Sequence, residues 1–259
     1  MDDAQNIQER GPHRGRLLVG TSGFAYPDWA PLFYPAGTRA GDLLREYSAR
    51  LAAVELNNTF YQQPKPERVA AWLAATPPDF RFVVKAQRGG SLRALGSAAQ
   101  QTVDWLTGPY RAFRDRLGCV LYRVPKEIQR DDQKLAALLA VWPTDLDLTV
   151  EFQHPSWHDD EVFDMLQSHG AALCATDLDE TESPDLRRTA EHIYLRLRRT
   201  AYTADELSVW ADRLEAFIAD GTDCYVFFRH DELGQSALRA LRLRELLESR
   251  VFRSGDGPS

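Results

Sequence analysis

Short apolar runs alternate along this chain with longer stretches that place apolar side chains three and four residues apart. Such runs predict buried strands, and the longer stretches predict amphipathic helices. The expected strands cover 17–20, 53–57, 80–86, 119–124, 146–152, 171–176, 192–197 and 224–228. The expected helices cover 39–51, 66–75, 100–117, 131–141, 159–169, 204–219 and 234–247. Gly108-Pro109 predicts a break in the third helix, and the polar segment 177–190 takes the place of a helix.

This alternation favours one fold. Strands separated by helices form parallel sheets, and eight such units favour a closed (β/α)8 barrel, the TIM-like α/β fold. An open doubly wound sheet is the alternative. We expect a single domain over residues 16–250, a disordered N-terminal tail over 1–15 and a flexible C-terminal tail over 251–259, because both ends are polar and lack periodicity.

Four expected strands carry a charged residue near their carboxyl ends. These are Glu55, Lys85, Glu151 and Arg196, and each alternates with apolar neighbours. Because the outer face of a barrel strand meets helices, the charged side chains should face the lumen. Buried charges persist only when they are paired. The set is therefore either a preorganised polar site or a structural ion-pair network, and the location of barrel active sites at this edge favours the former.

Further polar and aromatic residues follow the strands and form a candidate ligand-binding set. The candidate substrate contacts are Ser22, Phe24, Tyr26, Asn57, Tyr61, Arg88, Trp157 and Arg196. Aromatic side chains at a barrel mouth can stack on sugars or bases, or they can pack the loops onto the barrel. His154 and Asp177 also stand at strand ends. An unperturbed histidine titrates near neutrality, so His154 suits proton transfer, although a hydrogen-bonding role within its own loop is the alternative.

Composition limits the classes of molecule that the protein is expected to bind. The 259-residue chain has a formal net charge of -7, which disfavours nucleic acid as a partner. Its three cysteines, Cys119, Cys174 and Cys224, have no metal-binding spacing and lie in apolar runs, as expected of core residues in a reducing cytoplasm. No apolar run approaches the roughly 20 residues needed to cross a bilayer. We therefore expect a soluble cytoplasmic protein that binds a small molecule.

The candidate catalytic residues, Glu55, Lys85, Glu151, His154 and Asp177, admit several chemistries. One is a hydrolase or lyase with a divalent metal on carboxylate and imidazole ligands, although no His pair has a ligand-like spacing. Another is metal-free acid–base chemistry, with Glu151 or Glu55 as the base and Lys85 and Arg196 stabilising charge. Lys85 as a Schiff-base nucleophile is disfavoured, because neighbouring carboxylates favour its charged form. A nucleic-acid or carbohydrate binding protein without turnover is the remaining alternative.

Six segments resemble a known family. They are VGTSGFAYPDW (19–29), FYPAG (33–37), VELNNTFYQQP (54–64), FRFVVKAQR (80–88), EFQHPSW (151–157) and YVFFRHD (225–231). In this order they are similar to the domain-of-unknown-function 72 family (DUF72, YecE-like). The resemblance implies a TIM-like barrel whose reaction is not established.

The chain departs from the family pattern at several strand ends. Gln87 stands where the family usually has Pro, Gln153 where it usually has Arg, and Arg198 where it usually has His, and the segments 89–95, 122–125 and 228–231 also differ. Glu55, Asn57, Lys85, Glu151, His154 and Asp177 are kept. We therefore expect an enzyme acting on a polar small molecule, anionic or polyhydroxylated, and an inactive paralogue is the alternative.

Overall fold

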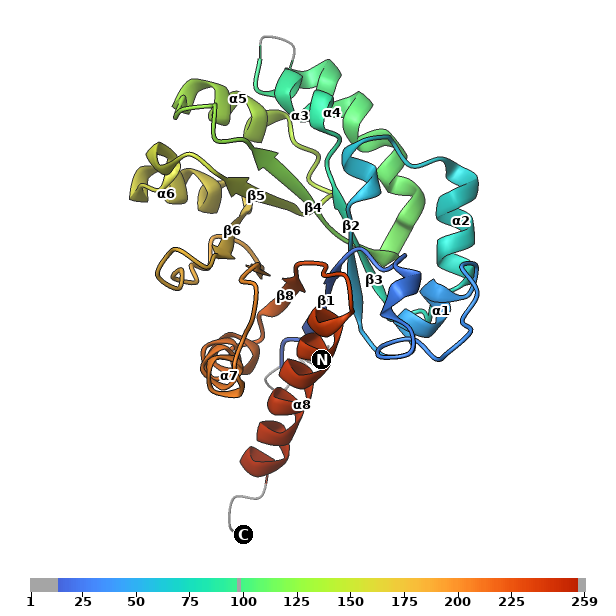
Figure 1. Ribbon diagram of the computed structural model, residues 1–259. Helices are drawn as coiled ribbons and strands as arrows, with labels where there is room; N and C mark the ends of the chain where they lie inside the picture. The colour runs from blue at the N-terminus through green and yellow to red at the C-terminus, as the bar shows by residue number, and fades with distance from the viewer. Residues whose placement is uncertain (1–13, 97–98, 256–259) are drawn as a thin grey trace, which may run out of the picture.

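Eight parallel strands close into a barrel in the computed structural model, which describes residues 14–96 and 99–255 (Figure 1). Each strand pairs with its sequence neighbours, and β1 closes the barrel by pairing with β8. The strands are β1 (Leu17–Ser22), β2 (Ala53–Leu56), β3 (Arg81–Lys85), β4 (Leu117–Val124), β5 (Leu148–Phe152), β6 (Ala172–Asp177), β7 (His192–Leu197) and β8 (Asp223–Phe228). The predicted single-domain (β/α)8 barrel is confirmed.

The helices surround the strands (Figure 1). They are α1 (Leu43–Ser48), α2 (Pro66–Ala74), α3 (Arg88–Ala94), α4 (Ala99–Thr107), α5 (Asp132–Val141), α6 (Asp160–Ser168), α7 (Ala204–Ala219) and α8 (Gln235–Gly255). Four shorter 3-10 segments are η1 (Pro27–Trp29), η2 (Asn58–Phe60), η3 (Gly108–Arg116) and η4 (Pro155–Trp157). Within the described residues, no helix is long and apolar enough to span a lipid bilayer.

Most sequence-predicted elements lie within a few residues of their observed bounds. The predicted helix over 100–117 breaks at Gly108, as expected, and the segment between β6 and β7 has no helix. Helix α3 was not predicted, because Gly89 and Gly90 disfavour a helix. The Gln87 side chain offsets this by accepting a hydrogen bond from the Gly90 N–H at 2.7 Å.

Both predicted tails fall partly outside the described residues. Residues 1–13 and 256–259 lie outside them, but Arg14 forms an ion pair with Glu215 of α7 at 2.6 Å, and the Gly15 N–H donates to the Ile218 carbonyl. Helix α8 continues to Gly255, eight residues beyond its predicted end at Leu247. The segment 251–255, expected to belong to a flexible tail, is therefore helical.

Local signals in the sequence explain where the helices begin and end. Thr203 and Glu206 form a reciprocal capping box at the start of α7, which satisfies two otherwise unpaired donors. Asp131 and Asp159 cap α5 and α6, each by accepting a hydrogen bond from a backbone N–H of the first turn. Gly170 follows α6 with a φ of +65°, a conformation that glycine adopts at little cost. These ends set the lengths of the connections to the next strands.

Strand alternation divides the interior into two cores. One face of each strand packs against the helices, as Val54, Phe82 and Val84 do. The other face fills the lumen, where Ala53, Val83 and their counterparts on other strands form a separate cluster. Charged residues lie above this cluster, at the carboxyl ends of the strands. The predicted alternation of side chains is therefore observed, and it brings Glu55, Lys85, Glu151 and Arg196 to one level of the barrel.

At the opposite end of the lumen, His192, Thr149 and Cys119 form a small network of neutral side chains. The His192 imidazole lies 2.8 Å from the Thr149 hydroxyl, which in turn contacts the Cys119 thiol. Burial lowers the pKa of His192 to about 4, so the ring is neutral at pH 7. The lumen thus has a cluster of neutral side chains toward one end and charged side chains at the other.

Candidate functional site

Arg196 lies at the centre of the charged end and joins two carboxylates. Its guanidinium donates to Glu55 Oε1 at 2.8 Å and to Glu151 Oε1 at 2.7 Å. All three side chains are almost fully buried. Because the two acids surround the guanidinium, the pKa of Arg196 is raised well above its usual value despite the opposing effect of burial. The Glu55–Arg196–Glu151 triad is thus ionised.

Glu55 is completely occupied by protein partners. Ser22 donates a hydroxyl hydrogen bond to Oε1 at 2.8 Å, and Tyr194 donates one to Oε2 at 2.8 Å. Burial alone would raise the pKa of Glu55, but Arg196, Lys85 and these hydroxyls outweigh it and lower the pKa to about 2. A carboxylate this acidic and this fully bonded is a poor proton acceptor.

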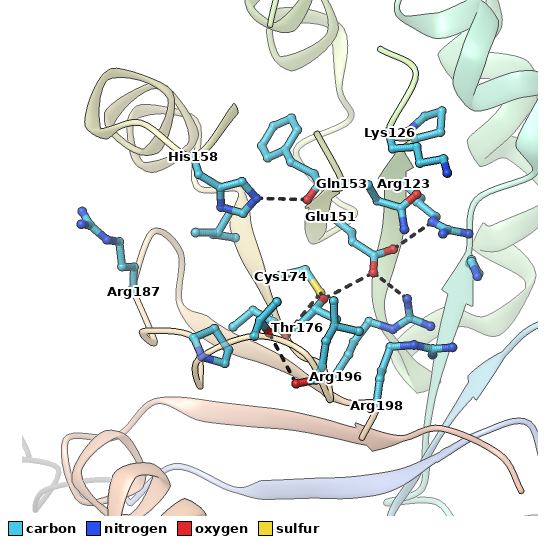
Figure 2. Close-up of a pocket in the computed structure, with 18 of the residues that line it drawn as sticks. Arg123, Lys126, Glu151, Gln153, His158, Cys174, Thr176, Arg187, Arg196 and Arg198 are labelled. Atoms are coloured by element: carbon cyan, nitrogen blue, oxygen red, sulfur yellow. Dashed lines mark hydrogen bonds and ion pairs between the residues drawn. The ribbon is translucent and has the colours of Figure 1, made fainter. Parts of the chain in front are cut away.

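Glu151 is tied to the protein on one oxygen only. Its Oε1 accepts from Arg196 and, at 3.4 Å, from the Thr176 hydroxyl. Its Oε2 lies 3.2 Å from Arg123 Nε, an ion-pair contact without hydrogen-bond geometry, and has no hydrogen-bond donor among the described residues. Figure 2 shows Arg123 and Arg196 pointing toward Glu151 from two sides. Burial opposes ionisation, yet these cations lower the pKa of Glu151. Oε2 is thus a buried acceptor that receives no hydrogen bond from the described residues.

Lys85, at the end of β3, has no carboxylate in contact. It is 7% exposed, and its Nζ lies 4.5 Å from the centre of the Phe60 ring. Within the described residues, its ammonium group makes no ion pair or hydrogen bond. Burial and the charge of Arg196 lower the pKa of Lys85 to about 8, although Glu55 and Glu151 act in the opposite direction. The site therefore contains an amine that titrates near neutral pH.

Arg198 is a second cation without a partner at this edge. It follows β7 and is half-buried, and its side chain has no ion pair or hydrogen bond within the part of the chain that the structure describes. Burial and the neighbouring charge of Arg196 both lower its pKa. Figure 2 shows Arg198 beside Arg196.

Of these side chains, Lys85, Glu151, Arg196 and Arg198 line a cavity of about 1020 Å³. Arg88 and Lys126 lie nearer its mouth, and the segment between β6 and β7 forms one wall. Basic residues outnumber acidic ones along the lining, whereas the whole chain has a net charge of -7. The cavity is therefore opposite in sign to the rest of the protein, and it would attract an anion.

The structure separates the predicted residues into three groups. Lys85, Arg88, Glu151 and Arg196 line the cavity, whereas Ser22 and Glu55 support it from below. The others belong to neither group: Phe24, Tyr26, Asn57, Tyr61, His154, Trp157 and Asp177.

The predicted residues outside the cavity have structural partners. His154 Nδ1 accepts a hydrogen bond from the Ser156 N–H and caps η4, which is the alternative role considered for it. Asp177 is fully buried and bonded to Arg199 and Tyr202, each at 2.9 Å. These contacts hold the ends of β6 and β7 together.

The predicted stacking aromatics contact protein rather than the cavity. Tyr26 stacks on His230 with ring centroids 5.2 Å apart and is hydrogen-bonded to the Asn57 side chain. Phe24 packs near Tyr47 at 6.2 Å. Trp157 is fully buried against Phe152 at 4.7 Å. Tyr61 is 77% exposed, and its neighbour Phe60 is the aromatic residue that reaches the cavity from this loop.

Several cavity residues were missed by the sequence reasoning. Arg123 is two residues beyond Leu121, a lumen residue of β4, so the same alternation that identified Lys85 could have found it. Arg198 likewise continues the alternation of Arg196 beyond β7. His158 lines the cavity with its Nε2 3.2 Å from the Phe152 carbonyl, and no periodic signal marks it.

The proposed metal ligands do not gather at one point. Among residues 14–96 and 99–255, no group of three or more His, Cys, Asp or Glu side chains is placed to hold a metal ion. The carboxylates of Glu55 and Glu151 are held by arginine, Asp177 is bonded to Arg199, and Asp231 caps the start of α8. The residues present do not fit a metal centre.

Comparisons with known proteins agree with this fold. The UPF0759 protein YunF of Bacillus subtilis (strain 168) is 21% identical, over 90% of this chain and 95% of its own length. The UPF0759 protein YecE of Escherichia coli (strain K12) is 27% identical, over 54% of this chain and 50% of its own length.

Solved structures give the same result. A DUF72 family protein from Thermotoga maritima MSB8 is 27% identical, with a TM-score of 0.77 over 90% of this chain and 99% of that one. A DUF72 family protein from Enterococcus faecalis V583 is 18% identical, with a TM-score of 0.75 over 90% and 96%, which shows the shared fold alone. The model of the family described as "Protein of unknown function DUF72" matches residues 18–258. The chain therefore belongs to the DUF72 family.

Proposed function

We propose that this protein is an enzyme that binds a small anionic molecule in the cavity and uses Lys85 to transfer protons. One observation carries the proposal: Lys85 and Arg198 face one cavity with no acidic partner among the described residues. Unpaired buried charges are costly, so proteins retain them where a ligand completes the pairing. An anion between these groups would supply that partner.

Lys85 is the best proton-transfer group in the cavity. A general base or acid works best when its pKa lies near the operating pH. The pKa of Lys85, lowered to about 8, meets this condition, whereas the lowered pKa of Glu151 leaves it a weak base. Glu151 Oε2 instead offers a fixed acceptor that orients a ligand hydroxyl or amino group.

The cysteine at the cavity is not an alternative nucleophile. Burial raises the pKa of the Cys174 thiol well above its usual value. A thiol in that state carries almost no thiolate at pH 7 and reacts slowly.

The experiment that tests anion binding is a thermal-shift titration with malonate, inorganic phosphate and glycerol at constant ionic strength. The two anions should raise the melting temperature with saturation, because a ligand that binds only the folded state stabilises it. Glycerol should give no saturating shift. Arg198→Met should abolish the response to anions. Arg111→Met is the matched control, because Arg111 is exposed and paired with Asp145 outside the cavity. Equal responses of the two variants would contradict the proposal.

Binding without turnover is the second candidate. It is favoured by the triad, because Arg196 holds both carboxylates that the sequence assigned to catalysis. Recovery of every bound ligand chemically unchanged, with the anion response intact, would support this candidate over the enzyme.

A further inference from the structure

The Lys85 amine has the surroundings of a nucleophile rather than those of an ion-pair partner. The nearby carboxylate oxygens already have contacts: those of Glu55 with Arg196, Ser22 and Tyr194, and those of Glu151 with Arg196 and Arg123. The sequence argument against a Schiff base assumed that these carboxylates would hold the ammonium. In the structure they are held by arginine instead, so that argument no longer applies.

The choice of residue at position 85 is unusual for this chain. Only four of its 31 basic residues are lysines, namely Lys65, Lys85, Lys126 and Lys134, and the others are arginines. Arginine serves well for fixed charge, but its guanidinium remains protonated and is not a nucleophile at neutral pH. Lysine thus stands at a buried cavity position where the positive charge has no acidic contact among the described residues.

Arginine side chains on two other strands influence the charge state of this amine. Arg196 on β7 and Arg123 on β4 disfavour its ammonium form, while Glu55 on β2 and Glu151 on β5 favour it. The balance, with burial, lowers the pKa of Lys85 to about 8, so about a tenth of the amine is neutral at pH 7. Desolvation next to other cations is a recognised way to activate a lysine.

The position of Lys85 is also fixed. Its carbonyl accepts a hydrogen bond from the Thr59 hydroxyl at 2.8 Å, which holds η2 against the end of β3. This contact places Phe60 against the Lys85 side chain, where the ring shields the amine from solvent. A cation on that nitrogen is favoured by the ring, and this holds for an iminium as well as for an ammonium.

We propose that Lys85 forms an imine with the carbonyl carbon of a small oxo acid whose carboxylate lies against Arg198. This inference rests on the anion site of the proposed function, gives Lys85 a covalent role in place of proton transfer, and narrows the anionic ligand to one that also carries a ketone or aldehyde. Arginine pairs with carboxylates through two parallel hydrogen bonds, and the guanidinium of Arg198 has no protein partner among the described residues. Glu151 Oε2 would accept a hydrogen bond from the oxygen that is lost.

The reaction balances without a further reagent. The neutral amine attacks the carbonyl carbon, a C–N bond forms, and the carbonyl π electrons move to oxygen. A proton passes from nitrogen to this oxygen, which gives a carbinolamine. A second proton then lets the C–O bond break with loss of water, while the nitrogen lone pair forms the C=N bond of the iminium. Starting from the ammonium, one ammonium and one carbonyl group yield one iminium and one water.

The test uses the full-length protein, pyruvate as the probe and sodium cyanoborohydride to trap the imine. Each trapped imine adds the mass of pyruvate less one oxygen atom. Peptide mapping then measures the labelling rate at each of the four lysines within one sample. Lys85 should be labelled at least about tenfold faster than Lys65, Lys126 and Lys134, because more of it is neutral. Acetone should give a smaller preference for Lys85, because it lacks the carboxylate that Arg198 would bind, and malonate should suppress labelling of Lys85 alone.

Two outcomes separate the two proposals. If malonate stabilises the protein through Arg198 but Lys85 is labelled no faster than the other lysines, the imine is wrong and the proposed anion site stands. If malonate neither stabilises the protein nor suppresses labelling, the anion site and the role of Arg198 in the imine are both wrong. Lys85→Arg should remove the fast label and keep malonate binding, with Lys126→Arg as the matched control at the cavity mouth. Because the mapping is done on the unaltered chain, the result does not depend on how well the variants fold.

Discussion

Two halves of the charged end of the barrel differ in how their charges are satisfied. On one side, Arg196 is enclosed by Glu55 and Glu151, and hydroxyl groups complete most of the hydrogen bonding. On the other side, Lys85 and Arg198 face a cavity without an acidic contact in the described residues. Both halves are built from the ends of neighbouring or facing strands, so strand position alone does not separate them. We infer from this difference that the first half supports the barrel, and we propose that the second half binds a ligand.

The largest expected effect comes from breaking the supporting half. Arg196→Met leaves two buried carboxylates without their shared partner, and removal of one member of a buried ion pair costs about 3 to 5 kcal/mol. Urea denaturation should show this loss in the free energy of unfolding. Arg198→Met is the control, and its free energy of unfolding should equal or exceed that of the unaltered protein. A similar loss of unfolding free energy in both variants would show that Arg198 supports the fold as Arg196 does, and the two halves would not differ.

Acid titration should produce a smaller effect in the same half. The pKa of Glu55 is lowered from 4.5 to about 2 in the folded state, so its contribution to stability is complete above pH 4.5 and is lost as pH falls toward 2. The contribution is about 3 kcal/mol. Urea denaturation at a series of pH values should therefore show a steeper acid loss in the unaltered protein than in Glu55→Gln. Parallel curves would show that Glu55 is not held as its contacts indicate.

The ligand-binding half should respond to pH with the same sign but in an alkaline range, because here the charged form of Lys85 is the destabilising one. The pKa of Lys85 is lowered from 10.5 to about 8 on folding, so between these pH values the unfolded chain binds more protons than the folded one. The contribution of Lys85 to stability should therefore rise from pH 8 to pH 10.5. The difference in unfolding free energy between the unaltered protein and Lys85→Met isolates this term.

At pH 7, the unfolding free energies of the unaltered protein and Lys85→Met provide a second test. Lys85→Met should stabilise the protein by about 1 to 3 kcal/mol, because it removes a buried charge that has no partner. Destabilisation at pH 7 would mean that Lys85 is paired in solution, and the two halves would then be alike.

The smallest expected effect on stability comes from a residue outside both halves, which serves as the reference for the variants above. His154→Ala removes the side-chain cap of η4 and should cost about 0.5 to 1 kcal/mol. The response to malonate should stay unchanged, as measured by the same thermal-shift titration. If His154→Ala lost the response to malonate, His154 would have to be counted among the ligand-binding residues.

Much of the barrel follows from periodicity, because alternation in each strand and helix reflects which face is buried. The same alternation located the charged level of the lumen. It could not show which charges pair, since Glu55 and Lys85 both lie on the lumen face near the carboxyl ends of adjacent strands. Pairing depends on the reach of the Arg196 side chain across the lumen, a distance set by the barrel as a whole. Residues such as His158 enter the cavity from loops, where no period applies.

The segment between β6 and β7 has a consequence for how the cavity of this barrel can be altered. It contributes Leu178, Thr181, Glu182, Pro184, Asp185 and Arg187 to the cavity wall, yet it belongs to no helix or strand. Figure 1 shows it as a loop at the side of the barrel. Substitutions there alter the shape and charge of the wall and leave the strand hydrogen bonds intact. Substitutions in this one loop can therefore change which ligand fits the cavity while Lys85, Arg196 and Arg198 are retained.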